Sequence, residues 1–308
     1  MTKKLTINEN VSARTQSDST QPTRTTTWGE ALDYTFKTRH TWRHGNGRGT
    51  ALINTGHFTR LRGRSFPVGR ITQACLSQVC IELEEECKAD ATINRIVSAV
   101  STVLNHCAMD GLMAAAPKLR RRKEVEHRMT WFSKDQVESL VYGSLDPFDR
   151  KDLADLIVVA GYTGMRQSEL LKLRAVDVDL SHNYIHVGGR PEVITKAGNY
   201  RCLPIHDRIK GILAGRMESV GPNVRLFGDE WRDRDQLLRA FKKVRNYVGG
   251  FDDTYVFHTL RHSFGTWCAE AGVPMRTLMD LMGHQRIETT LRYAKTTDKA
   301  RVDAIDLI

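Results

Sequence analysis

The sequence predicts a mainly α-helical protein of two domains, with one small antiparallel sheet in the second. Three observations predict this fold class. Apolar residues recur at helical spacing through most of the chain, short β-rich runs are confined to one stretch near residues 183–205, and a basic segment separates two regions of different pattern. The 308 residues are enough for two ordinary domains, and the 40% hydrophobic share is normal for a folded protein.

The first domain is predicted to be helical over residues 25–115, after a flexible polar tail at 1–24. The tail lacks hydrophobic periodicity and the apolar core of a signal peptide, and no run of the sequence is long enough to cross a bilayer, so we expect a cytoplasmic protein. Thr27 is placed to cap the first helix. Two stronger helices follow, and Gly111 is a natural stop for the second. Their apolar residues are Ile71, Cys75, Leu76, Val79, Leu83 and Cys87, then Ile93, Ile96, Val97, Val100, Val103, Leu104 and Cys107.

A basic interdomain linker is predicted at 116–128, before a second domain at 129–308. Five of the first six residues of Lys118–Arg128 are Lys or Arg. Such a run is either a solvated linker or one that crosses a DNA backbone, and the two are compatible. The whole chain has a formal net charge of +10, which favours a polyanionic partner but also fits a basic protein without one.

The second domain is predicted as helices around a small sheet. Ser133 and Gln136 have the spacing of a capping box, and an apolar helix at 152–160 is expected to end at Gly161. A second helix is expected at 166–173. Three β-rich runs, NYIHV, EVIT and RCLPI, then predict an antiparallel sheet of about three strands, and the remainder is helical.

The sequence predicts no cofactor and no metal site. None of the six cysteines forms a CxxC pair or stands at zinc-finger spacing with histidines, so we expect buried free thiols. The glycine-rich run HGNGRG lacks the lysine and the hydroxyl residue of a P-loop. It is predicted to be a turn.

Two segments of the second domain place polar residues where chemistry could occur but where a structural role is the simpler interpretation. In TGMRQSEL, Arg166 and Glu169 are three residues apart and share a helical face, which alone predicts a surface ion pair. Lys196 opens a hairpin loop, a position where exposed lysines are routine.

A third segment, FHTLRHSF, combines His258 and Arg261 at a helix start that Thr259 is expected to cap. Free N–H groups and the helix dipole at such an end favour an anion. An arginine there is unfavourable unless something negative is near. This local conflict hints at a phosphate site.

The fourth segment, LMGHQRIETTLRYAK, contains His284 after a glycine and Tyr293 near the end of a short helix. Ile287, Leu291 and Ala294 form the apolar stripe of that helix, and Tyr293 is expected beside the stripe. Taken alone, the pattern favours a packing role for the tyrosine.

Together, the four segments fit one reaction on a phosphodiester. Arginines suit the non-bridging oxygens because guanidinium binds phosphate bidentately and stays protonated. A tyrosine hydroxyl can attack phosphorus, a histidine can accept its proton, and a lysine can protonate the departing sugar oxygen. Cationic side chains would then stabilise the charge of the transition state in place of a metal ion.

The ordered set TGMRQSEL, hairpin lysine, HTLRH, LMGH and TLRYAK resembles the signature of the tyrosine recombinases, the phage integrase family. The nine residues from His284 to Tyr293 resemble the family's spacing, and the resemblance covers about 129–298. The run ATINRIVSAVSTVLNHCAMDGL looks like the last long helix of the family's core-binding domain. The resemblance implies the DNA breaking-rejoining fold, arranged as a C-shaped clamp on DNA.

The resemblance also implies catalytic roles for six residues and a supporting role for Glu169. The six are Arg166 and Arg261 as phosphate clamp, His258 and His284 as hydrogen-bond partners of the phosphate, Lys196 as general acid for the 5′-hydroxyl, and Tyr293 as the nucleophile that forms a 3′-phosphotyrosine. His258 is also expected to help take the tyrosine's proton. His262 matches a common family position and receives no role. Strand exchange would need neither ATP nor metal.

The partners that the resemblance implies are double-stranded DNA core or attachment sites, a homo-tetramer on paired sites, and a DNA-bending or directionality factor. The apolar stripe Val302, Ile305 and Ile308 is expected to dock on a neighbouring subunit. The first 24 residues are too short for a separate arm-binding domain. We favour a phage or mobile-element integrase. The alternatives are an Xer-type resolution recombinase, a type IB topoisomerase and a non-catalytic DNA-binding accessory protein.

Overall fold

The structure is a computed structural model that describes residues 26–45, 47–124, 129–188, 200–227, 231, 234–294 and 305–306. The chain forms two compact units, Met1–Glu126 and His127–Ile308. Across the described residues, no helix is both long and apolar enough to span a membrane.

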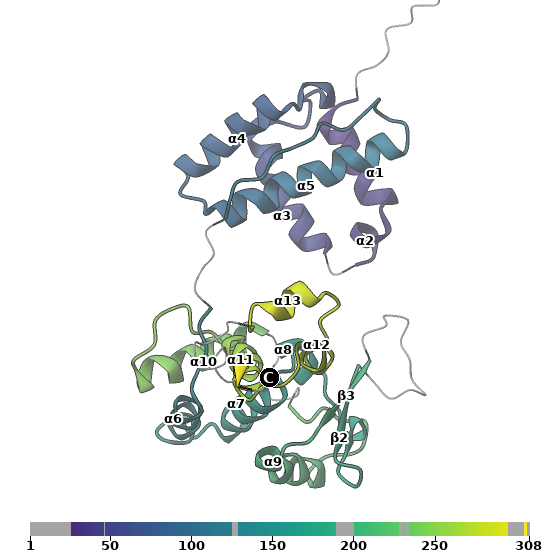
Figure 1. The fold of residues 1–308 in the computed structure, drawn as a ribbon. Helices are drawn as coiled ribbons and strands as arrows, with labels where there is room; N and C mark the ends of the chain where they lie inside the picture. The colour runs from purple at the N-terminus through teal and green to yellow at the C-terminus, as the bar shows by residue number, and fades with distance from the viewer. Residues whose placement is uncertain are drawn as a thin grey trace, which may run out of the picture. The chain divides into compact units, whose positions relative to one another are not determined.

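The first unit is entirely helical in its described part (Figure 1). Its helix α5 packs against α1, α3 and α4. The helices are α1 (Trp28–Thr38), α2 (His40–Arg43), α3 (Arg48–Arg62), α4 (Gln73–Glu85) and α5 (Asp90–Met109), with a 3₁₀ turn at Val68–Arg70.

The predicted helix start at Thr27 is confirmed, because its hydroxyl accepts from Glu30 N and the Glu30 carboxylate accepts from Thr27 N. The apolar core of this unit contains the residues that the helical spacing selected, except Cys75, which is half-buried beside the core, and Cys87, which is exposed. Trp28 is fully buried against Phe58 with its ring edge-on, at a centroid separation of 4.7 Å. Of the six free cysteines, only Cys107 is fully buried, so the expectation of buried thiols holds for one residue and is wrong for the exposed Cys87 and Cys202.

The described part of the basic segment lies against the first unit. Asn94 on α5 donates to Arg122 O (2.9 Å) and accepts from Arg122 N (2.8 Å). The Arg122 guanidinium pairs with Asp90 and Glu84, at 3.0 and 2.9 Å. At least one of the cations predicted to face a phosphate backbone is therefore paired with carboxylates of its own unit. Residues 125–128 lie outside the described residues.

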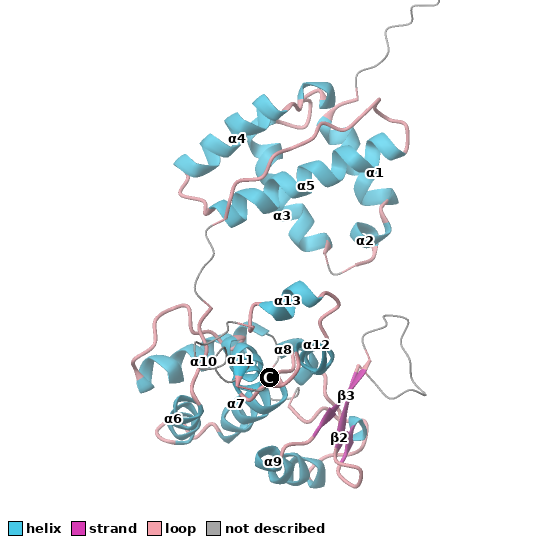
Figure 2. Ribbon diagram, in the orientation of Figure 1, coloured by secondary structure: helices cyan, strands magenta, loops and turns pink. Residues whose placement is uncertain are grey.

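The second unit combines helices with a three-stranded sheet, which confirms the predicted fold class (Figure 2). Its elements are α6 (Lys134–Leu145), α7 (Lys151–Thr163), α8 (Gln167–Leu170), β1 (Val178–Asp179), β2 (Tyr184–Val187), β3 (Arg201–Pro204), α9 (Asp207–Glu218), α10 (Arg234–Val248), α11 (Thr259–Glu270), α12 (Met275–Met282) and α13 (Ile287–Leu291), with a 3₁₀ turn at Ala175–Asp177. The capping box of Ser133 and Gln136 at the start of α6 is confirmed.

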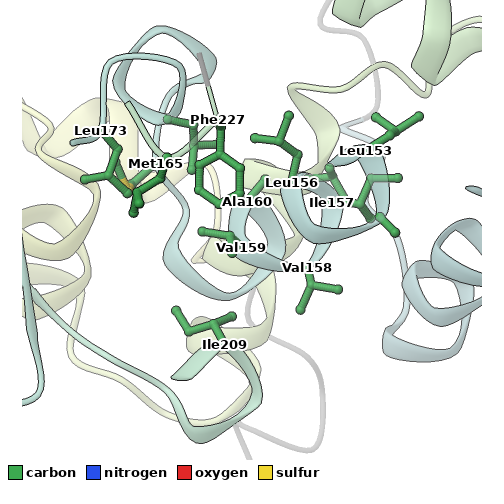
Figure 3. Packing of buried hydrophobic residues seen from close by; sticks show 14 of the residues in the cluster. Leu153, Leu156, Ile157, Val158, Val159, Ala160, Met165, Leu173, Ile209 and Phe227 are labelled. Atoms are coloured by element: carbon green, nitrogen blue, oxygen red, sulfur yellow. The ribbon is translucent and has the colours of Figure 1, made fainter. Parts of the chain in front are cut away.

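Helix α7 is the centre of the second unit. Apart from Asp155, all of its residues from Leu153 to Ala160 are apolar and buried, as expected of an enclosed helical segment. The helix contacts α6, α8, α9, α10 and α11. Figure 3 shows Leu156, Ile157 and Val159 of α7 among the buried side chains of this core, with Phe227 and Ile209 contributed from later segments. This rigid helix fixes the position of the chain that follows it.

The sheet is antiparallel, in the order β1–β2–β3. Ile185 pairs with Leu203 and His186 with Cys202. Two of the predicted β-rich runs, NYIHV and RCLPI, contain β2 and β3. The run EVIT lies outside the described residues, and β1 was not predicted because two residues are too short for a recognisable pattern.

Three predicted helix boundaries are wrong. Helix α7 continues past Gly161 to Thr163 and ends at Gly164, whose φ of 61° is the left-handed conformation that glycine adopts without strain. The helix expected at 166–173 is the single turn α8. Thr259 does not cap α11; it is the first helical residue, and its hydroxyl accepts from Val256 N instead.

Candidate active site

Arg261 is buried (3% exposed) in the first turn of α11. Its Nη1 donates to Gly164 O and its Nη2 to Met282 O, both at 2.6 Å. These carbonyls stand at the C-terminal ends of α7 and α12, where unpaired carbonyls carry negative partial charge. The electrostatic conflict expected at the start of α11 is therefore resolved inside the protein, by the ends of two other helices.

Arg166 immediately precedes α8, and its side chain reaches the C-terminal end of α12. Its Nη2 donates to Gly283 O at 3.0 Å, and its Nη1 donates to Glu169 Oε1 at 2.8 Å. The Glu169 carboxylate also accepts from the Arg166 backbone N–H at 2.8 Å. The side chain of Arg166 remains 38% exposed, so one guanidinium is accessible where the other is enclosed.

Glu169 is held by a second arginine, Arg201, which donates to both carboxylate oxygens at 2.8 and 3.2 Å. Burial alone would raise the pKa of Glu169. The hydrogen bonds and charge of Arg201, together with those of Arg166, outweigh burial and lower this pKa to about 2. Burial and then the charge of Arg166 lower the pKa of Arg261 to about 10, so this guanidinium is still protonated at neutral pH.

Tyr293 is buried, with 5% of its surface exposed. Its hydroxyl is hydrogen-bonded to His262 Nδ1 at 2.9 Å, and its ring lies parallel to that of His284 at a centroid separation of 6.4 Å. Gly265 makes room for the ring, because a Cβ at this position would lie 2.7 Å from two of its atoms. Burial raises the pKa of the Tyr293 hydroxyl, although the nearby charge of Arg261 opposes this.

The two histidines beside the tyrosine are neutral at pH 7. Burial is the largest cause in each case and lowers the pKa of His262 and of His284 to about 4. The charge of His258 adds to this at His262, and that of Arg261 adds to it at His284. His284 Nδ1 is hydrogen-bonded to Thr290 Oγ1 at 2.8 Å, which fixes the ring against α13.

Two cavities open at Arg166. The larger, of about 760 Å³, has an apolar floor that includes Phe241 and is also lined by Lys242 and His258. The smaller, of about 380 Å³, is lined by Arg166, Gly283, His284, Gln285, Arg286 and Thr289. Tyr293 lines neither of these two cavities. An anion bound at Arg166 could therefore meet His258 on one side and His284 on the other.

Residues 130–300 match the model of the phage integrase family. The chain belongs to this family. A tyrosine recombinase of Thermosipho africanus (strain TCF52B) is 25% identical over 228 residues, covering 73% of this chain and 78% of the relative. Tyrosine recombinase XerD of Listeria innocua serovar 6a is 26% identical over 229 residues, covering 69% and 74%. The solved structure of the Tn1549 transposon integrase with a circular intermediate DNA shares the fold, with a TM-score of 0.74, 18% identity, and coverage of 92% of this chain and 100% of that chain.

The structure of this tyrosine recombinase brings most of the expected site residues together. Arg166, Glu169 and Arg261 meet at the ends of α7 and α12, with His284 and Tyr293 beside them. His258 is exposed at the start of α11, with its ring 5.0 Å from that of His262. Lys196 lies outside the described residues, and so do Val302 and Ile308 of the C-terminal stripe.

Two residues of the site were not assigned by sequence reasoning. His262 was given no role, yet it is the hydrogen-bond partner of the tyrosine. Arg201 was read only as part of a strand. A signal was present: the strand alternates buried and exposed, and Arg201 shares its buried face with Leu203. A cation on an inward face requires a partner.

The expected placement of Tyr293 is wrong. It was predicted beside an apolar stripe, but Ile287 and Leu291 are 36% and 50% exposed while Tyr293 and Thr290 are buried. Helix α13 ends at Leu291, so helical spacing does not extend to residue 293.

Proposed function

We propose that this recombinase cleaves one DNA strand by attack of the Tyr293 hydroxyl on a phosphorus atom. The new bond joins the phenolic oxygen to phosphorus, and the bond from phosphorus to the 5′ oxygen breaks. The tyrosine loses its proton to a base, and the departing 5′ oxygen gains one. The 3′-phosphotyrosine retains the energy of the phosphodiester, so that a second 5′-hydroxyl can reverse the step on another strand.

One observation carries this proposal: a tyrosine, two arginines and a neutral histidine from three separated segments lie together in one unit. Arg166, exposed between the two cavities, is suited to bind the non-bridging oxygens of the phosphate. Arg261 adds positive charge and, through its bond to Met282 O, holds the end of α12 whose Gly283 carbonyl accepts from Arg166. Neutral His284 can donate a hydrogen bond from the ring nitrogen that Thr290 does not occupy.

The structure leads us to revise how Tyr293 is proposed to lose its proton. His258 was expected to help accept it, whereas the hydroxyl is paired with His262 in the structure. A histidine with a pKa of about 4 is a weak base toward a phenol whose pKa is raised. We therefore propose that His262 holds Tyr293 in a buried resting position. The tyrosine leaves this position when DNA binds, and His258, which lines the larger cavity with Arg166, accepts the proton.

Lys196 is proposed as the acid that protonates the 5′ oxygen. Lys196 precedes Arg201, the first residue of β3, by five residues in the sequence, and Arg201 binds Glu169 in the arginine cluster. This short separation in sequence and the place of Lys196 in the family signature support the proposal.

The proposed partner is double-stranded DNA, bound as paired core or attachment sites by a homo-tetramer, with an accessory bending or directionality factor. The net charge of +10 supports a polyanionic partner. Ile305, 67% exposed, supports the proposal that the C-terminal stripe docks on a neighbouring subunit. If deleting residues from Thr297 onward left cooperative assembly on paired sites unchanged, this docking would be excluded.

The proposed process is integration or excision of phage or mobile-element DNA. The similarity to a transposon integrase supports this, while the similarity to XerD supports the alternative of dimer resolution. The test uses plasmids that carry one or two copies of a DNA site that the protein binds. Recombinant products that require two sites support the proposal. Relaxation of supercoils on any plasmid, without exchange, would instead establish a type IB topoisomerase.

A further inference from the structure

Arg201 is an arginine on the inward face of the small sheet. Its side chain is 8% exposed, and it makes three contacts. Nη2 and Nη1 donate to the two oxygens of Glu169, at 2.8 and 3.2 Å, and Nε donates to Leu281 O at 2.9 Å. One planar guanidinium thus joins three elements that are distant in sequence, namely β3, α8 and the end of α12.

Both partners of Arg201, Glu169 and Leu281, are linked to Arg166. Glu169 is the carboxylate that holds Arg166, and Leu281 belongs to the same helix end as Gly283, whose carbonyl accepts from Arg166. Gly283 packs directly on Arg201, because a Cβ there would lie 2.8 Å from Arg201 Nη1. The left-handed φ of 63° at Gly283 aims this turn at the cluster.

The charges explain why the arrangement needs Arg201. Each oxygen of the Glu169 carboxylate accepts one hydrogen bond from Arg166 and one from Arg201, so its acceptor sites are filled by donors of the protein. Without Arg201, Glu169 could rotate toward Arg166 alone or toward water, and the exposed guanidinium would lose its fixed orientation. Arg201 itself lines neither cavity at Arg166, so it affects a bound phosphate through Glu169 and the turn.

We propose that Arg201 is a positioning residue of the recombination reaction: it fixes Glu169 and the α12 turn so that Arg166 is presented to the scissile phosphate. The inference rests on the proposed function.

The test compares Arg201→Met with Arg208→Met in the full chain. Arg208 makes a similar paired contact with Glu138, at 2.8 Å, but on the surface of α9 and away from the cluster. Single-turnover cleavage of a site-bearing DNA should fall by on the order of 100-fold in Arg201→Met, since misplacing a catalytic group by about 1 Å has an effect of that size. Arg208→Met should cleave like wild type. The dissociation constant for DNA should be unchanged in both, because neither residue is proposed to touch phosphate.

A double-mutant comparison separates positioning from general destabilisation. If Arg201 acts through Glu169, the losses in Glu169→Gln and Arg201→Met should not add in the double variant. Arg201→Lys, which keeps the charge but cannot contact two oxygens in the same plane, should recover only part of the rate. Additive losses, a parallel loss of DNA affinity, or full activity of Arg201→Met would overturn the inference.

The outcome is distinguishable from failure of the proposed function. If wild type forms no covalent adduct with DNA, the function itself fails. If wild type forms the adduct and folded Arg201→Met forms it equally fast, only this inference fails. Thermal unfolding of each variant at the assay temperature shows whether the protein compared is folded.

Discussion

The buried position of Tyr293 can be tested through Gly265, which lies under its ring in α11. Replacing Gly265 with alanine puts a Cβ about 2.7 Å from two ring atoms of Tyr293, a separation that cannot be kept. Overpacking of this kind costs ~1–3 kcal/mol. Alanine in a helix interior stabilises the fold by ~0.5–1 kcal/mol relative to glycine. We therefore expect Gly265→Ala to destabilise the second unit by ~0–2.5 kcal/mol.

The same substitution should behave differently once the ring is removed. In a Tyr293→Ala background the clash is gone, and Gly265→Ala should be neutral or stabilising. The coupling between the two sites should therefore equal the clash, ~1–3 kcal/mol. Gly161→Ala is the matched control: it is also helical, but its Cβ would meet the Trp267 ring at 3.7 Å, an ordinary contact. It should stabilise both backgrounds equally.

The assay is urea unfolding of the full chain, with hydrogen exchange of α11 and α12 peptides to assign the transition to the second unit. An identical effect of Gly265→Ala in both backgrounds would refute the buried position of the ring.

The remaining predictions concern pH, metal and leaving group. His262 and His284 have pKa values of about 4 in the folded protein, against an ordinary 6.5. Between these two pH values the unfolded chain binds more protons than the folded protein. The contribution of the two histidines to the free energy of unfolding should therefore be fully present above pH 6.5 and be lost as the pH falls toward 4. Melting temperatures should show this between pH 7 and 5, and a double His→Gln variant that kept the same slope would contradict it. Cleavage should persist in EDTA because arginines supply the positive charge; a loss that Mg²⁺ restores would count against this. Lys196→Ala should slow cleavage of normal DNA by on the order of 10²–10⁴-fold but spare a 5′-phosphorothiolate, whose leaving group needs no acid; equal losses on both would remove Lys196 as the acid.

The sequence was sufficient for the fold class and for several of the residues that the structure brings together around Arg166. Arg166, Arg261 and His284 stand at turns or next to helix ends. Polar residues at such positions that do not serve as helix caps are easily recognised in a sequence. Helix starts at Thr27 and Ser133 were predictable because capping depends on residues three positions apart. Such local rules need no tertiary information.

The rest of the site depends on contacts between distant segments. Arg201 binds Glu169, 32 residues earlier, and the carbonyl of Leu281, 80 residues later. His262 binds Tyr293 across 31 residues. The boundary at Gly164 was missed because two glycines, three residues apart, end the same apolar run, and only packing decides which one takes the left-handed conformation.

The central claim is that Tyr293 is the nucleophile. The most direct measurement is covalent capture on nicked DNA that carries the site and releases a short strand after cleavage, so that religation is prevented. Wild type should form a protein–DNA adduct stable to denaturation, linked through a tyrosine to the 3′ phosphate, and Tyr293→Phe should form none. An adduct that persists in Tyr293→Phe would contradict the account.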